Sequence, residues 1–308
     1  MANAKLVLIA GGSGFIGRAI ARRLAALAEP RVRIMSRNPA RARQLLPDSP
    51  IEFVAGEVTQ PQSLPAAMAG VDCVINAVQF DGYPVEDAAR GLTFERIDYG
   101  GTLALLESAK AAGTGRFIYI SGASADPLSS HPGFRAKGQA ERAIGQSGLE
   151  FTIFRPSLVF GREDRTVNLF AKALRYSPIF AVPGTGLQRV QPVWIEDVAA
   201  AVALALTNPA ARNRCFEIGG PQPMSFDDFM RLLMDITGHH RPLFHVPEGL
   251  LRMVGRVVEK LPRPVLSADA VTFLTADHLC DTQPLVAALG VRLTPLRQAL
   301  SYLAPAAA

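Results

Sequence analysis

The segment IAGGSGFIGRAI (residues 9–20) constrains the fold of this 308-residue chain more than any other stretch. Its glycines follow an apolar run, KLVLIA, and precede a segment with helical periodicity. The spacing suits a tight turn at Gly11, close approach of backbone amides to a pyrophosphate at Gly14, and tight helix–strand packing at Gly17. The N-terminus of the following helix would offer N–H donors to phosphate groups. We therefore predict a dinucleotide site formed by Gly11, Ser13, Gly14, Phe15, Ile16 and Gly17.

Short apolar runs alternate with longer amphipathic segments through the first half of the chain. Runs at 5–10, 31–36, 51–56, 71–78, 116–121 and 151–156 have the length of strands, and several are apolar on both faces. This pattern predicts an α/β fold with a Rossmann-type, doubly wound parallel sheet covered by helices on both sides. Helices expected at 166–176, 225–238 and 247–261 predict a smaller, mostly helical C-terminal lobe.

The domain boundary predicted from this pattern is interleaved. We expect the NAD(P)-binding domain to span residues 1–160. The chain would return to this domain at about residues 190–220. The smaller substrate or partner lobe would then comprise residues 161–189 and 221–308.

The end of the second predicted strand bears on the type of dinucleotide. A carboxylate here would bind the ribose diol of NAD, but the sequence reads MSRNPARAR, with Ser36 and Arg37 at the turn. The arginine fork matches a ribose 2′-phosphate, so NADP(H) is favoured over NAD(H). Arg41 is a second candidate for the phosphate. The alternative is that Arg37 only caps a surface turn.

Two further segments complete the predicted dinucleotide site. GEVTQ (56–60) places Glu57 and Val58 where they can contact an adenine edge, and NAV (76–78) ends the fourth strand near the ribose. The residues expected to contribute from the latter segment are Asn76, Ala77 and Val78.

Composition excludes several classes of protein. No apolar run reaches the roughly 18 residues of a membrane-spanning helix. Cys73, Cys215 and Cys280 have neither metal-ligand spacing nor a disulfide framework, which suits a cytoplasmic protein without a metal. A net charge of +5 is compatible with an arginine-rich solvated surface or with anionic partners. No DNA-reading motif is present, so we expect no nucleic-acid partner.

The order of these motifs, followed by YISGAS, FRPSLVFG and QPVWIEDVA, resembles the extended or atypical short-chain dehydrogenase/reductase superfamily, which is epimerase/dehydratase-like. Within it, YISGASADP, FTIFRPSLVFGRED and FEIGGPQPMSFDDFM are similar to the NAD(P)-binding accessory subunit of respiratory complex I (alpha subcomplex subunit nine) and its bacterial relatives. The resemblance implies a catalytic tyrosine four residues before a lysine, with a serine on the preceding strand.

Lys137 matches the lysine of that pattern, but position 133 is glycine. Ser121 is the candidate serine, although the usual slot falls on Gly122, with Ser124 a less favoured substitute. His131 is a less favoured replacement acid, and Asp98 stands where asparagine is frequent. The resemblance implies that Lys137 still contacts the nicotinamide ribose, so Lys137 and Ser121 are the catalytic candidates and Lys137 is also a cofactor contact.

The segment after the sixth strand is expected to cross the nicotinamide side of the site. Pro156 and Val159 are predicted cofactor contacts. Arg189 could meet an anionic substrate group or an interdomain carboxylate, and we expect it near Gln191 and Trp194. For Trp194 a core position is favoured over a ligand contact.

The segment PEGLLRMVGRVVEKLPRP (247–264) is amphipathic. We favour a helix that packs its apolar side on the core, and the alternative is a helix on an anionic membrane or a partner subunit. The apolar positions are Leu250, Leu251, Val254, Val257, Val258 and Leu261, and the basic ones are Arg252, Arg256, Lys260 and Arg263.

These observations lead to two functional hypotheses. The first is an NAD(P)H-binding protein without the catalytic tyrosine, with a structural or regulatory role linked to respiratory complex I or quinone metabolism. Such a protein would be cytoplasmic and peripheral at the inner face of the cell membrane. The second is an active NAD(P)-dependent reductase or nucleotide-sugar epimerase/dehydratase.

Overall fold

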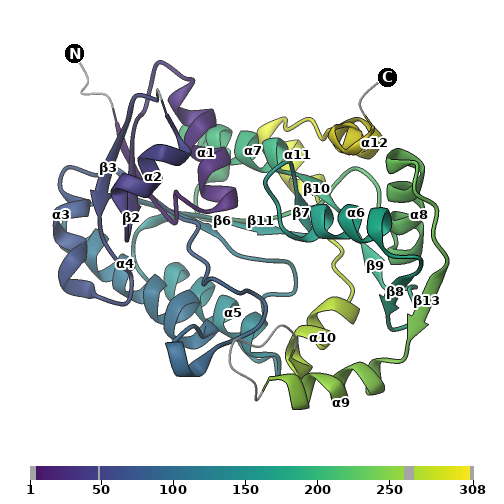
Figure 1. The fold of residues 1–308 in the computed structure, drawn as a ribbon. Helices are drawn as coiled ribbons and strands as arrows, with labels where there is room; N and C mark the ends of the chain where they lie inside the picture. Colours follow the sequence, from purple (N-terminus) through teal and green to yellow (C-terminus); the bar gives the residue numbers. More distant parts are fainter. Residues whose placement is uncertain (1–4, 48, 260–266, 306–308) are drawn as a thin grey trace.

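The computed structural model describes residues 5–47, 49–259 and 267–305. Its centre is a seven-stranded, entirely parallel sheet in the order β11-β6-β5-β4-β1-β2-β3 (Figure 1). The two neighbouring central strands, Leu6–Ala10 and Cys73–Asn76, are buried on both faces because helices cover both sides of the sheet. The strands are β1 (Leu6–Ala10), β2 (Arg31–Ser36), β3 (Ile51–Ala55), β4 (Cys73–Asn76), β5 (Arg116–Ile120), β6 (Glu150–Pro156) and β11 (Arg214–Ile218).

Each face of the sheet packs against its own helices and has its own apolar core. On one face lie α1 (Phe15–Ala25), α2 (Pro39–Leu45), α7 (Ile195–Thr207) and α11 (Gln283–Leu289). On the other lie α3 (Leu64–Met68), α4 (Gly101–Ala111) and α5 (Pro132–Gly145), together with a π-helical segment, Phe94–Gly100. Figure 1 shows the two helical layers above and below the strands.

A third apolar core lies beside the sheet. It is formed largely by α6 (Thr166–Tyr176), α8 (Phe226–Thr237) and α12 (Leu296–Ala299), with short strand pairs around it, while α9 (Glu248–Val258) and α10 (Ala268–Thr275) lie below (Figure 1). The pairs are β7 (Val159–Phe160) with β10 (Val193–Trp194), β9 (Arg189–Val190) with β12 (Met224–Ser225), and β8 (Phe180–Pro183) with β13 (Leu243–Val246).

The predicted fold class is confirmed: the molecule has a Rossmann-type parallel sheet and a helical C-terminal portion. The returning segment contributes α7, which covers the sheet beside α1, and β11, which pairs with β6. The division into two domains at the stated residues stays a prediction.

The preferred interpretation of the amphipathic segment is wrong for most of its apolar positions. In α9 only Gly255 is buried, whereas Leu250, Val254 and Val257 are exposed to solvent. The reason is that α9 packs against the start of α10 through the side that carries Gly255. A Cβ on Gly255 would lie 2.8 Å from the Ala268 nitrogen. Lys260, Leu261 and Arg263 lie outside the described residues. Among the described helices, none is long and apolar enough to cross a bilayer.

Candidate functional site

The glycine loop joins the end of β1 to the start of α1. Gly11 has a φ of +77°, and a Cβ there would lie 2.5 Å from the carbonyl oxygen of Ala77 at the end of β4. A Cβ on Gly17 would lie 2.3 Å from the Gly11 oxygen, so only glycine fits either position. The Gly14 N–H donates to the Gly11 oxygen at 2.9 Å and closes the turn. These contacts give Gly11 and Gly17 the roles that the spacing predicts.

The loop lies where the strand order reverses. β1, β2 and β3 build the sheet outward to one edge, and β4 lies on the other side of β1 and begins the other half, so the crevice between the carboxyl ends of β1 and β4 is the usual ligand position in such sheets. The N-terminus of α1 opens into this crevice, with Gly14 as its first flanking residue and no side chain capping it. Ser13, Phe15 and Ile16 are only partly buried there. Free N–H groups at this end can therefore receive phosphate oxygens.

Asn76 shapes the second wall of the crevice. Its Oδ1 accepts from the Val78 N–H at 3.1 Å, and its Nδ2 donates to Thr102 Oγ1 at 2.9 Å. The Thr102 hydroxyl in turn donates to the Asp98 carbonyl at 2.5 Å. The predicted residues Asn76, Ala77 and Val78 therefore lie beside the glycine loop, and Asn76 serves to fix the loop that follows β4.

The carboxyl end of β2 carries Ser36 and Arg37. Ser36 Oγ accepts a hydrogen bond from the Asn38 N–H at 3.2 Å, and this bond holds the turn. The Arg37 side chain is exposed to solvent. Sequence reasoning missed that other cations gather nearby. The pKa of Asp81 is lowered by a hydrogen bond from Arg165, 3.0 Å away, and also by the charges of Arg90 and Arg37. Arg165 forms an ion pair with Asp81, and Arg90 and Arg37 are near enough for their charges to lower its pKa, so this part of the molecule holds three guanidinium groups.

Glu57 and Val58 follow β3, but their side chains are engaged with the protein. Glu57 accepts from Thr59 Oγ1 and Gln60 Nε2, both at 2.9 Å. Val58 is buried against Gly101 at the start of α4. Any contact with an adenine edge would therefore come from the backbone or the outer edge of these residues.

Lys137 lies on α5 and forms a buried ion pair with Asp98. Its Nζ is 3.1 Å from Asp98 Oδ1, and the two side chains are 8% and 0% exposed. Burial disfavours the charge on Lys137, but Tyr119, Asp98 and Tyr83 outweigh burial and raise its pKa. Burial raises the pKa of the Asp98 carboxyl, and the Lys137 ammonium opposes that shift. The ammonium is thus charged and held in place by Asp98, a role for Asp98 that no sequence motif indicated.

Position 133, where the resemblance expects a tyrosine, is filled by other side chains. A Cβ on Gly133 would lie 2.9 Å from ring atoms of Phe94 and 3.2 Å from the His131 ring. Phe94 is 1% exposed and comes from the π-helical segment, about forty residues earlier in the chain. An apolar ring therefore occupies the space into which a phenol on α5 would project.

His131 caps the N-terminus of α5. Its Nδ1 accepts from the N–H groups of Gly133 at 3.2 Å and Phe134 at 3.4 Å, and its Nε2 donates to the Asp269 carbonyl at 3.1 Å. Burial lowers the pKa of His131 below its ordinary 6.5. Both ring nitrogens are engaged with backbone groups, so the structure gives no support to His131 as a replacement acid.

The serine candidates differ in position. Ser121 Oγ is buried and lies 2.5 Å from Glu141 Oε1, and Glu141 is in turn paired with Arg155. Ser124 is exposed with a φ of +68°. Gly122, by contrast, would direct a Cβ to 3.5 Å from Lys137 Cδ. The slot beside Lys137 therefore belongs to Gly122, which has no hydroxyl, while the Ser121 hydroxyl is taken by Glu141.

The later predicted residues are distributed over the neighbouring strands. Pro156 ends β6 and its carbonyl accepts from the Ala123 N–H at 2.8 Å, while Val159 pairs with Val193. Gln191 is buried and bonds Gly220 and Cys280, so it joins loops and does not face a ligand. Arg189 is exposed, and Trp194 packs between Phe160 and Tyr302, which agrees with the favoured core position.

An aromatic cluster on the same edge of the sheet was not predicted. The loops after β4 and β5 bring rings to α10, with centroid separations from 4.4 to 6.3 Å. Tyr83 is the only phenol of this cluster, and burial raises its pKa despite the nearby Lys137 charge. The cluster consists of Phe80, Tyr83, Phe94, His131, Phe134, Phe273 and His278.

The residues present fit a dinucleotide. The glycine loop is too crowded for any Cβ at Gly11 or Gly17, yet it leaves the α1 N-terminus open. Asp98 Oδ2 is buried without a hydrogen-bond partner among the described residues, and its ion-pair partner Lys137 is the more exposed of the two side chains. Across the described chain, no group of three or more His, Cys, Asp or Glu side chains has the arrangement of a metal site.

Comparison with known proteins agrees with this geometry. A family model described as NAD(P)H-binding matches residues 11–209, more than half of the chain. An NAD(P)H azoreductase from Xenophilus azovorans is 28% identical over 288 residues, which cover 91% of this chain and 92% of that protein. The mitochondrial NADH dehydrogenase [ubiquinone] 1 alpha subcomplex subunit 9 of Rattus norvegicus is 29% identical over 249 residues. That match covers 79% of this chain and 64% of the rat protein.

Solved structures share the fold. An NADPH-dependent quinone oxidoreductase from Escherichia coli, complexed with NADPH, superimposes with a TM-score of 0.75 at 20% identity. The match covers 96% of this chain and 99% of that one. The predicted resemblance to reductases of this superfamily and to the complex I alpha subunit is therefore confirmed.

Proposed function

Because the chain belongs to the NAD(P)H-binding family, we propose that it binds NADP(H) mainly as a structural or regulatory ligand and lacks tyrosine-based proton transfer. The observation that carries this proposal is the Phe94 ring at the place of a side chain on residue 133. Of the two described side chains nearest that position, Phe94 has no proton to exchange, and both ring nitrogens of His131 are engaged with backbone groups. Lys137 keeps its charge through Asp98 and can still hold a ribose hydroxyl.

The preference for NADP(H) over NAD(H) is part of the proposal. Arg37 is exposed at the end of β2, and Arg90 and Arg165 add positive charge around Asp81. A ribose 2′-phosphate carries negative charge that such a group of guanidinium side chains binds well. The ribose diol of NAD would gain nothing comparable from them.

The relatives support a proposal on partners. The rat relative is named as a subunit of NADH dehydrogenase (ubiquinone), and 79% of this chain aligns with it. We propose an association of this protein with complex I subunits or with quinone metabolism, in the cytoplasm and peripheral to the inner face of the cell membrane. Bound only by the folded state, the dinucleotide would stabilise the protein by mass action even without turnover.

A second candidate function is the reduction of a planar conjugated acceptor. Two observations favour it: the aromatic cluster beside Lys137, and the azoreductase that aligns over almost its whole length. Nicotinamide supplies the hydride chemistry when it is bound. A conjugated acceptor can spread the negative charge and take its proton from water, so it does not require the missing phenol. Epimerisation or dehydration of a nucleotide sugar does require a proton acceptor at the sugar, which this site lacks at position 133.

Native mass spectrometry of freshly isolated protein tests the first proposal. We expect a bound mass that corresponds to NADP(H), released on unfolding. Absence of any nucleotide, together with no stabilisation by added NADPH, would refute dinucleotide binding.

Turnover assays separate the two candidates. We expect no NADPH oxidation with panels of carbonyl compounds and nucleotide sugars. Steady oxidation with quinones or azo compounds, abolished by Lys137→Ala while NADPH binding persists, would favour the second candidate. Steady conversion of a nucleotide sugar would contradict both.

A further inference from the structure

A short segment, residues 161–165, joins β7 to α6 beside the candidate dinucleotide site. Its first residue packs on the glycine loop side of the crevice. A Cβ on Gly161 would lie 3.3 Å from the ring of Phe15, which is in the first turn of α1. The rest of the segment carries three charged side chains that are exposed and one that is buried. We call residues 161–165 the strap.

The strap is tied to α1 through Glu163. Its carboxylate lies 3.0 Å from Arg18 and 2.8 Å from Arg22, and each arginine takes a different oxygen. The Arg18 side chain is only 15% exposed, so this tie is partly shielded from water. The hydrogen bond from Arg22, with the charges of both arginines, holds the pKa of Glu163 below its ordinary 4.5. The carboxylate is therefore charged at neutral pH and holds the strap to the first wall of the crevice.

The strap is tied to the opposite wall through Arg165. Its guanidinium donates to Asp81 Oδ1 at 3.0 Å, and Asp81 lies on the loop that follows β4. Both side chains are largely exposed, so this tie is the weaker of the two. Glu163 and Arg165 are two residues apart, which is roughly 7 Å of chain at most. The strap therefore extends from α1 to the loop after β4, across the mouth of the crevice between them.

The base of the strap is fixed to the C-terminal portion. Asp164 accepts hydrogen bonds from the N–H groups of Val167 at 2.6 Å and Gly161 at 3.1 Å. The Tyr302 hydroxyl donates to the Gly161 carbonyl at 2.9 Å. Gly161 and Asp164 are buried, whereas the side chains that reach the two walls are exposed. The outer ion pairs can therefore break while the base stays folded.

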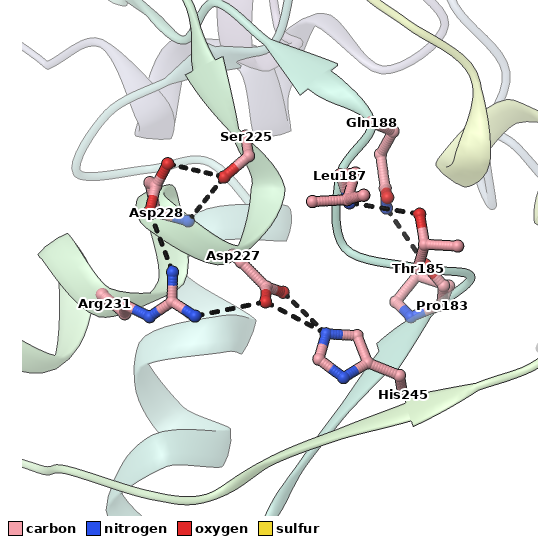
Figure 2. Close-up of polar contacts among 9 residues, drawn as sticks. All are labelled: Pro183, Thr185, Leu187, Gln188, Ser225, Asp227, Asp228, Arg231 and His245. Carbon is pink, nitrogen blue, oxygen red and sulfur yellow. Dashed lines mark hydrogen bonds and ion pairs between the residues drawn. The ribbon is translucent and has the colours of Figure 1, made fainter.

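The body that carries the strap has polar ties of its own. α6 follows the strap and shares the third apolar core with α8. On α8, Asp227 lies 3.0 Å from His245 of β13, and its N–H donates to the Gly186 carbonyl at 3.0 Å. Figure 2 shows that Arg231 binds the same carboxylate, at 3.4 Å, and also Asp228, at 2.9 Å. These contacts lie on neither wall of the crevice.

We propose that the strap closes the crevice over a bound dinucleotide and must open for the dinucleotide to enter or leave. The ion pairs that hold it join protein to protein, so weakening them makes opening more frequent whether the crevice is filled or empty. The association and dissociation rate constants should then rise together while Kd stays nearly constant. The proposal rests on the proposed dinucleotide binding, and it adds that slow exchange retains the ligand.

Stopped-flow fluorescence with NADPH tests the strap. Glu163→Gln removes both charged contacts with α1 and keeps a side chain of nearly the same shape. Partly exposed ion pairs each contribute a small factor, so we expect both rate constants to rise about threefold or more and Kd to change by less than about twofold. A faster dissociation with unchanged association would instead show that Glu163 or its partners contact the ligand directly, and would overturn the strap.

Arg231→Gln is the matched control because it also removes two charged contacts of similar length, on α8 (Figure 2). It should exchange NADPH like the unmodified protein. Unchanged rate constants in Glu163→Gln would overturn the strap and leave dinucleotide binding in place. Equal acceleration in Arg231→Gln would mean a general loosening of the fold and would also overturn it. A protein that binds no NADPH at equilibrium would refute the proposed function and the strap together.

Limited digestion with trypsin locates the closure. Arg165 is a cleavage site in the strap, and the exposed Arg256 on α9 is a reference site outside it. Saturating NADPH should slow cleavage after Arg165 more than cleavage after Arg256, and Glu163→Gln should reduce this difference. Equal slowing at both sites would mean that NADPH only stabilises the whole fold, and would overturn closure of the strap.

Discussion

At the scale of single residues, position 133 decides most about the chemistry of this protein. Residue 133 on α5 is a glycine, and the Phe94 ring packs so closely on it that a Cβ there would lie 2.9 Å from the ring. The packing is complementary: a small residue on one element admits a large ring from another. A phenol at this position would therefore require a change at Phe94 as well.

The first prediction concerns Gly133→Ala. Alanine normally stabilises a helix relative to glycine by up to about 1 kcal/mol. Here the added methyl group would lie 2.9 Å from the buried Phe94 ring, so we expect the free energy of unfolding to fall by at least about 1 kcal/mol. Gly145→Ala is the control on the same helix, since nothing lies within 4 Å of its Cβ. Denaturant titration measures both, and equal stability of the two variants would contradict the packing argument.

The second prediction concerns Arg37→Ala. A charged hydrogen bond to phosphate is worth about 1.5–3 kcal/mol, so the Kd for NADPH should rise about tenfold or more. The Kd for NADH should stay unchanged because it has no 2′-phosphate. Arg31→Ala, at the opposite end of β2, is the control and should alter neither value. Isothermal titration calorimetry measures all four constants, and a parallel loss for NADH would argue against the NADP(H) preference.

At the scale of elements, the strands and the first helix were the easiest to predict. The segment with helical periodicity after the glycine loop forms α1, which ends at Ala25. α5 carries Lys137, and its beginning depends on His131, whose role as a cap cannot be seen in the sequence because histidine is not a common capping residue.

The third prediction concerns the pH dependence that His131 introduces. Its pKa is lowered by burial in the folded state, so between that pKa and 6.5 the unfolded chain binds more protons than the folded one. Stability is complete above 6.5 and falls as the pH drops below it, by at most about 1.4 kcal/mol per pH unit for one group.

His131→Asn should flatten this decline, since asparagine keeps a cap acceptor and does not titrate. Thermal melting between about pH 5 and 8 measures the effect in the range where histidine titrates. Asp269, Arg135 and His278 contribute to the same local field. The burial-lowered pKa of His278 should therefore preserve part of the slope. An unchanged curve in the variant would mean that His131 is not the titrating group.

At the scale of the whole molecule, the strand order places three groups together that are far apart in the chain. The glycine loop, the cations near Asp81 and the Lys137–Asp98 pair come from separate βα connections, yet all lie on the carboxyl edge of one sheet. A ligand that spans this edge would contact all three connections, which otherwise are held together mainly because each packs on the sheet. We therefore expect it to stabilise the whole molecule.

The fourth prediction measures that stabilisation. NADPH at one hundred times its Kd should raise the free energy of unfolding by about 2.7 kcal/mol if only the folded state binds it. Chemical denaturation with and without NADPH gives the value, and inorganic phosphate at the same concentration controls for ionic effects. A change below about 1 kcal/mol under these conditions would mean that the unfolded chain binds too or that the site is not formed.

The sequence by itself determined the parallel sheet, the glycine loop and the resemblance to NAD(P)H-binding reductases. These features could be predicted because strand length, helical period and glycine spacing are properties of consecutive residues and can be read directly from the sequence. Only the tertiary structure decided that the Phe94 ring packs at position 133, that Asp98 holds Lys137, and that the apolar side chains of Leu250, Val254 and Val257 on α9 stay in solvent. Each of these joins, or leaves unjoined, residues far apart in the chain, and the periodicity of a segment does not say which surface will pack against it.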